Sequence, residues 1–139
     1  MIGLASAATL TLLAAACGSD ESAGATDSAA VEANTWTLEE LAGEPVPAGV
    51  EVTLDFDGER ISGTGGCNQY GGDATFEDGT VTVATEIMST QMACEDPAAD
   101  VEGRYLEALP RAAGFVVEDT TLRVSDADDG SLLVFGAAE

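Results

Sequence analysis

The chain has 139 residues, with four Arg, no Lys and no His against 26 Asp plus Glu, and its formal net charge is −22. This charge repels phosphate backbones, which excludes nucleic-acid binding, and any attachment to an anionic membrane has to be covalent or apolar. The missing His and Lys exclude a Ser-His-Asp triad, a His-ligated metal, a Schiff base and a phosphate-loop lysine. Catalysis is left to carboxylates, tyrosines, hydroxyls or a cysteine, and we expect no cofactor and no metal.

The first sixteen residues, MIGLASAATLTLLAAA, carry no charge and are too few for a membrane helix, which needs about 20 apolar residues. They are typical of the apolar core of a signal peptide. No basic residue precedes Cys17, so translation is expected to start upstream of Met1, or Met1 is a misread start.

The residues LAAA before Cys17 resemble a bacterial lipobox, in which the cysteine becomes the lipid-bearing N-terminus. Two acyl chains suffice for stable anchoring. We therefore predict that residues 1–17 are a signal peptide with a lipobox ending at Cys17, and that Cys17 anchors an extracytoplasmic lipoprotein to the bacterial cell membrane. Cleavage at the A-x-A site, giving an ordinary secreted protein, is the alternative.

Residues 18–33, GSDESAGATDSAAVEA, are small, polar and acidic. Such a segment lacks the apolar surface that would offset the entropy of ordering it. The sequence therefore predicts a flexible acidic tether over 18–33 and a globular domain over 34–139.

From Asn34 onward, apolar and polar residues alternate with period two, which predicts antiparallel strands with one buried face. Trp36 and Leu38 share one face, with the Trp36 ring expected in the core. The predicted turns lie at Asp57-Gly58, Asp78-Gly79, Glu118-Asp119 and Asp128-Asp129-Gly130. About eight short strands result, and they have to close or be covered to avoid open edges.

One helix is predicted within EDPAADVEGRYLEALP. Asp96 is expected as its N-cap and Pro97 as its first residue, and Pro110 is expected to end it. Its apolar residues recur at helical spacing, at Val101, Tyr105, Leu106 and Leu109. The predicted fold class is mainly β (α+β): a small antiparallel twisted sheet or barrel of about eight strands with one helix packed against it.

The stretch ISGTGGCNQYGG, residues 61–72, holds five glycines. It is not a phosphate-binding loop, because it lacks the final glycine of G-x-G-x-x-G, has no lysine and is not followed by a helical pattern. A redox site at Cys67 is the second interpretation, and the absence of a C-x-x-C partner speaks against it. The favoured interpretation is a turn that specifies the fold beside a disulfide.

Three cysteines in an exported chain leave one for the lipid, Cys17, and one pair, Cys67 with Cys94. The chain-entropy model gives such a bridge about 3–4 kcal/mol of stability. Calcium binding at the acidic DADDG segment fails, since an EF-hand loop starting at Asp126 has Gly130 at position 5 and Ala137 at position 12. Acidic hairpin turns explain that composition better.

The assembled motifs resemble the META domain, the family of the HslJ-like envelope proteins. The resemblance covers Asn34 to about Ala137, and Gln69 departs from it, since a basic residue is common there. It rests on Trp36-x-Leu38, Ser62-Gly63-x-Gly65-Gly66-Cys67-Asn68-x-Tyr70-x-Gly72, Thr90-x-Met92-Ala93-Cys94 and Glu102-x-x-Tyr105-Leu106-x-Ala108-Leu109. It implies a barrel-like, mostly antiparallel fold with one helix, an envelope location and a loose link with heat or envelope stress, and it does not imply an enzymatic activity.

We accordingly expect a non-catalytic, monomeric binding or structural module that recognises an envelope protein or a small ligand. The candidate motif for binding or folding comprises Gly65, Gly66, Asn68, Tyr70, Thr90 and Met92. A carboxylate-dependent hydrolase and a thiol redox protein are the alternatives. Two converging carboxylates in a pocket would favour the first, and an exposed, readily reduced 67–94 bridge would favour the second.

Overall fold

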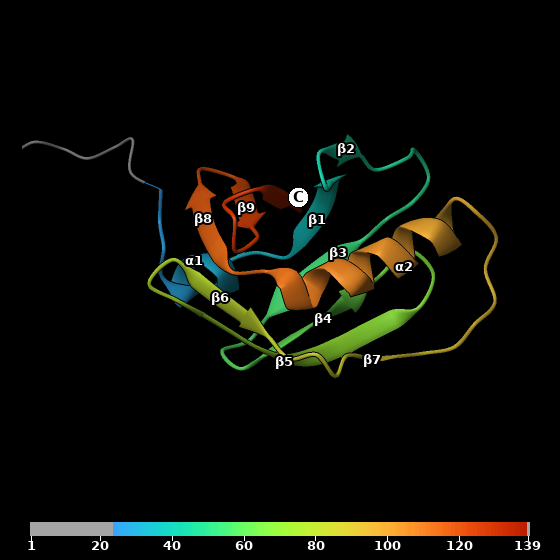
Figure 1. The fold of residues 1–139 in the computed structure, drawn as a ribbon, viewed down its shortest axis with the longest axis horizontal. Coiled ribbons are helices and arrows are strands. Elements are labelled where there is room, and N and C mark those ends of the chain that lie inside the picture. The colour runs from blue at the N-terminus through green and yellow to red at the C-terminus, as the bar shows by residue number, and fades with distance from the viewer. Residues whose placement is uncertain (1–23, 139) are drawn as a thin grey trace, which may run out of the picture.

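Alternating apolar residues build a closed antiparallel barrel in the computed structural model, which describes residues 24–138 (Figure 1). Of its ten strands, β2 and β7 are two-residue additions at the rim, and the other eight close because β10 pairs with both β9 and β1. The strands of the barrel follow one another in the order β1-β3-β4-β5-β6-β8-β9-β10. Closure removes the open edges that a meander of this size would otherwise expose.

The elements follow in chain order. The strands are β1 (Trp36–Leu41), β2 (Glu44–Pro45), β3 (Thr53–Phe56), β4 (Arg60–Thr64), β5 (Gln69–Glu77), β6 (Thr80–Val83), β7 (Met88–Ser89), β8 (Gly114–Glu118), β9 (Thr121–Ser125) and β10 (Ser131–Ala137). The helices are α1 (Ser28–Glu32), α2 (Ala98–Ala108) and the 3-10 turn η1 (Leu109–Arg111). The prediction of a mainly β barrel with one helix packed against it is confirmed, and α1 is a further short helix.

The predicted hairpins form because short-range turn chemistry agrees with the period-two pattern. Asp78 and Gly79 have φ values of +50° and +76° in the two-residue turn from β5 to β6, the conformation that Asp-Gly pairs favour. Along β5, buried and exposed residues alternate as predicted. Trp36 is fully buried, as expected for a core residue.

The barrel interior is filled by side chains. Two aromatic groups lie within it, one of Phe56, Phe76 and Phe115 with ring centroids 4.7 and 5.0 Å apart, the other of Tyr70, Tyr105 and Phe135 at 5.3 and 6.3 Å. The second group joins the barrel to α2, whose buried residues are Val101, Tyr105 and Ala108.

The prediction of a flexible tether over 18–33 is wrong for residues 24–33. Ala25 forms a β-bridge with Val117, with N–H to carbonyl distances of 2.7 and 2.8 Å. Asp27 caps α1 through the N–H of Ala30, and Val31 in α1 is fully buried in the core. The indole N–H of Trp36 donates to the carbonyl of Val31 at 2.9 Å, so this segment satisfies a polar group in the core.

The helix prediction needs one smaller correction. Asp96 is not the N-cap; that position is Pro97, whose backbone is already in the right-handed helical region and whose side chain offers no acceptor. The α-helix ends at Ala108, and Pro110 lies inside the 3-10 turn that follows it. Within the described residues, no helix is long and apolar enough to cross a membrane.

Candidate functional site

The two motif segments meet at the end of the barrel where β4 turns into β5. Asn68 is the centre of this cluster and the one polar residue that is buried within the described part of the chain, with 6% of its surface exposed. Its side-chain oxygen accepts from the N–H of Met92 at 2.7 Å and from the hydroxyl of Thr90 at 2.9 Å. Its side-chain NH2 donates to Glu102 at 2.8 Å and to the carbonyl of Met92 at 3.3 Å.

Glu102, on α2, closes the cluster from the helix side. Its Oε1 accepts from the backbone N–H of Asn68 at 2.5 Å and of Cys67 at 3.3 Å, while its Oε2 accepts from the Asn68 side chain. A β-carbon at Gly65 would lie 2.9 Å from this Oε1, so the missing side chain gives the carboxylate its room. Sequence reasoning found Glu102 only as part of the family resemblance, through its helical spacing from Tyr105.

Thr90 and Met92 use their polar groups for hydrogen bonds within the fold, which leaves these groups unavailable to a ligand. The Thr90 hydroxyl, besides donating to Asn68, accepts from the N–H of Gln69 at 3.1 Å, and the Thr90 N–H donates to the Gln69 carbonyl at 3.0 Å. Met92 joins the cluster through its backbone, and its side chain is 61% exposed. Both residues therefore fix the course of the segment after β7.

The cysteines join the same two segments. Cys67 and Cys94 are 27 positions apart in the sequence and lie at disulfide distance, with their Cα atoms 6.2 Å apart. The turn after β4 is therefore joined to the segment after β7 twice, by the Cys67–Cys94 link and by the hydrogen bonds from the Asn68 side chain to Met92. Gly66, with φ of +120°, makes the turn between β4 and Cys67.

Behind the turn, Tyr70 and Tyr105 form a buried pair. The Tyr70 hydroxyl donates to the carbonyl of Thr53 at 2.8 Å, and the two phenol oxygens are 2.6 Å apart. A phenol carries one proton, so Tyr105 donates to Tyr70. Burial raises the pKa of both hydroxyls, that of Tyr105 well above its usual value, and any charge on Tyr70 raises the pKa of Tyr105 further. Neither phenol is poised to release a proton near neutral pH.

Every predicted motif residue thus lies in one cluster, and its polar side chains are occupied by internal hydrogen bonds. Within the described residues, no buried side-chain nitrogen or oxygen lacks a partner, and no group of three or more Asp, Glu, Cys or His is placed to hold a metal ion. Cys17 lies outside the described residues.

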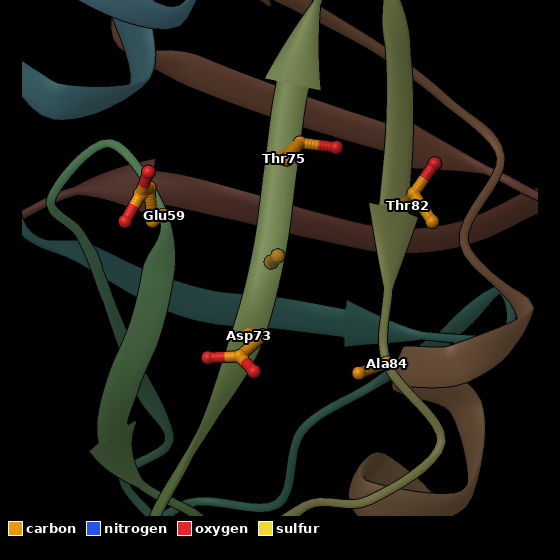
Figure 2. Close-up of a pocket in the computed structure, with 6 residues that line it drawn as sticks. Glu59, Asp73, Thr75, Thr82 and Ala84 are labelled. Carbon is orange, nitrogen blue, oxygen red and sulfur yellow. The ribbon is translucent and has the colours of Figure 1, made fainter.

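An open groove lies elsewhere, on the outer surface of the barrel. It has a volume of about 430 Å³, and Figure 2 shows Glu59 on the β3–β4 turn, Asp73 and Thr75 on β5, and Thr82 on β6 around it. Its two carboxylates belong to exposed residues, and Asp73 lies 3.5 Å from the Arg60 guanidinium. This open groove offers no enclosed pair of carboxylates for the hydrolase alternative.

Comparisons with known proteins agree with the geometry. The chain is similar in structure to a protein from Burkholderia xenovorans solved by NMR, with a TM-score of 0.62 and 27% identity over 78% of this chain and 83% of that one. A second NMR structure has a TM-score of 0.60 at 22% identity, covers 77% of this chain and 91% of its own, and supports the fold alone. No curated protein matches the chain. The model of the META domain matches residues 29–139, which includes most of α1, and the chain belongs to the META domain family.

Proposed function

We propose that the protein is a non-catalytic binding or structural module of the bacterial cell envelope, monomeric and held at the membrane by a lipid on Cys17. The observation that carries the non-catalytic part is the state of Asn68, whose side chain makes four hydrogen bonds inside the fold. A catalytic amide or carboxylate needs a free donor or acceptor for substrate. Here both the amide and its partner Glu102 are occupied in holding two segments and a helix together.

The charge of the chain supports the anchor part of the proposal. A protein of net charge −22 gains nothing from anionic lipid surfaces, so its attachment has to be covalent or apolar, and a lipid on Cys17 is the covalent route. Seven Cα-to-Cα steps separate Cys17 from Gly24, the first described residue. The next residue, Ala25, already pairs with Val117 on the barrel. A trans chain spans at most about 3.3–3.6 Å per residue, so the lipid would lie within about 25 Å of the barrel.

The anchor is tested by Cys17→Ser in the producing cell, followed by membrane fractionation and mass analysis of the mature N-terminus. The expected result is an unprocessed chain or a chain found in the soluble fraction. The double variant Cys67→Ser/Cys94→Ser is the control, since it also replaces cysteines but keeps Cys17 and should stay with the membrane. Normal maturation and unchanged fractionation of Cys17→Ser would overturn the proposal.

The link with envelope or heat stress is tested separately. Cells that lack the protein should grow less well than wild-type cells under heat or envelope stress. Wild-type protein should restore growth. The double variant Glu59→Gln/Asp73→Asn should restore it equally well if these two carboxylates do no chemistry. Failure of that variant alone would favour the hydrolase alternative.

A further inference from the structure

A small hollow lies between the helix and the β1–β2 turn, away from the motif cluster. Its volume is about 190 Å³. Leu41, Ala108 and Leu132 supply apolar lining, and all three are buried residues of the barrel and of α2. It also touches Arg104 and Arg111, one near the middle of α2 and one at the end of η1.

These two arginines are half of all the basic residues in the chain. Arg104 is engaged, with one nitrogen 3.0 Å from Glu44 and another 3.8 Å from Asp100. Arg111 has no carboxylate within 4.0 Å among residues 24–138. In a protein with 26 acidic residues, an arginine beside an apolar hollow therefore keeps its hydrogen-bond donors available.

The residue type at the turn beside the hollow also leaves the arginines available. Four non-glycine residues in the described chain have positive φ, and three of them are aspartates: Asp78, Asp119 and Asp129. The fourth is Ala42, with φ of +52°, in the two-residue turn between β1 and β2. Asp tolerates this conformation better than Ala does. Of these four turn positions, position 42 is the one that lines the hollow with Arg104 and Arg111. An Asp there would stabilise the turn better than Ala does, but its carboxylate would face the two arginines.

The remaining acidic group limits the ligand's charge. Glu107 also lines the hollow, so a doubly charged anion would meet a carboxylate as well as Arg111. The volume is about that of six water molecules at roughly 30 Å³ each, below the usual range for drug-sized ligands. Both facts favour a small ligand with one negative charge.

We propose that this hollow binds a short aliphatic monocarboxylate. The carboxylate pairs with the guanidinium of Arg111, and the alkyl part lies against Leu41, Ala108 and Leu132. The site is separate from the Asn68 cluster and does not depend on the lipid anchor. It goes beyond the proposed module by giving it a ligand class.

Titration of the isotope-labelled full chain with butanoate, followed by NMR, tests the site. Backbone amides of Leu41, Ala42, Arg111 and Leu132 should shift saturably, whereas butanamide, which has the same shape without the charge, should bind on the order of ten-fold more weakly. N-acetylvaline asks whether a peptide C-terminus is the source of the carboxylate. Equal binding of butanoate and butanamide, or no saturable shift with any carboxylate, would overturn the proposal.

Two pairs of variants isolate the charge. Arg111→Gln should weaken butanoate binding on the order of ten-fold or more, while Arg123→Gln, which changes the net charge equally on the exposed face of β9, should not. Ala42→Asp should bind at least ten-fold more weakly than the isosteric Ala42→Asn, although both should be at least as stable as wild type because Asp and Asn tolerate positive φ. Equal affinities within either pair would also overturn the proposal.

Discussion

The two ends of the barrel beside the β4–β5 hairpin are covered and held in different ways. At the end where Gly58 and Gly79 turn, α1 and the residues before it are held by backbone pairing with β8, by one buried side chain, Val31, and by the Trp36 indole. At the end where Asn68 lies, the closure consists of a disulfide, a side-chain amide with four partners and a buried tyrosine pair.

The difference has an energetic consequence. Backbone pairing tolerates most side chains, because the hydrogen bonds do not depend on residue type. The Asn68 end depends on particular atoms at particular places, so single substitutions there leave buried groups without partners. Stability should therefore be lost unevenly between the two ends, and the following substitutions measure how unevenly.

The largest effect is expected from removing the disulfide. The double variant Cys67→Ser/Cys94→Ser should lower the free energy of unfolding by about 3–4 kcal/mol, since the unfolded chain regains the freedom of the closed loop. Denaturant unfolding measures it, with Cys17→Ser as the control that leaves the folded domain unchanged. A loss below about 1 kcal/mol would show that the amide and tyrosines hold this end without the bridge.

Asn68→Ala comes next, at about 2–3 kcal/mol. The variant leaves the Met92 N–H without its acceptor and the Glu102 carboxylate without one donor, and buried groups that lose partners carry the full cost of desolvation. Gln69→Ala, at the exposed neighbouring position, should stay within about 0.5 kcal/mol of wild type. Similar losses for the two variants would mean that Asn68 is not the centre of this closure.

At the opposite end, Val31→Ala should cost about 2 kcal/mol through lost burial and the cavity left behind. Glu32→Ala, at the exposed neighbouring position of the same helix, is the matched control. A flexible tether would give no change for either variant, so thermal unfolding of this pair decides directly whether α1 belongs to the folded domain.

These two ends also differ in how far the sequence predicts them. The hairpins follow from local signals, such as Asp78-Gly79 between two alternating segments, and the motif cluster follows from cysteine pairing and the family resemblance. The α1 end offers little: one capping residue, Asp27, and one large apolar residue, Val31, among small and polar neighbours. Its partners Val117 and Trp36 lie far away in the sequence or in the next element. Glu102 is likewise one of 26 acidic residues, and only the fold shows that its carboxylate meets Asn68.

The tyrosine pair makes the Asn68 end sensitive to alkaline pH. Both phenols have pKa values raised by burial, so they stay protonated in the folded protein while those of the unfolded chain ionise near pH 10. The stabilisation is therefore complete below about pH 10 and is lost above it, at about 1.4 kcal/mol per pH unit for each phenol that ionises on unfolding. Unfolding of wild type and of Tyr70→Phe/Tyr105→Phe between about pH 9 and about pH 11 measures this, and parallel curves would contradict it.

The smallest effects come from two glycines, and they should have opposite signs. Gly66 has φ of +120°, and a β-carbon there would lie 3.3 Å from the Ala98 carbonyl oxygen and from Val50. Gly66→Val should therefore destabilise by more than about 1 kcal/mol through backbone strain. Gly103 lies in the exposed middle of α2, and no atom beyond its chain neighbours and the backbone of its own helix lies within 4 Å of an added β-carbon. Gly103→Ala should therefore stabilise by about 0.5–1 kcal/mol through helix propensity.

Melting temperatures of both glycine variants beside wild type measure this contrast between a turn that requires glycine and a helix that does not. An unshifted melting temperature for Gly66→Val would mean that the turn does not require glycine and that this glycine serves ligand binding instead. In that case the Asn68 cluster would have to open in solution, because in its closed form the side chains of Asn68 and Thr90 are already engaged with the fold's own partners.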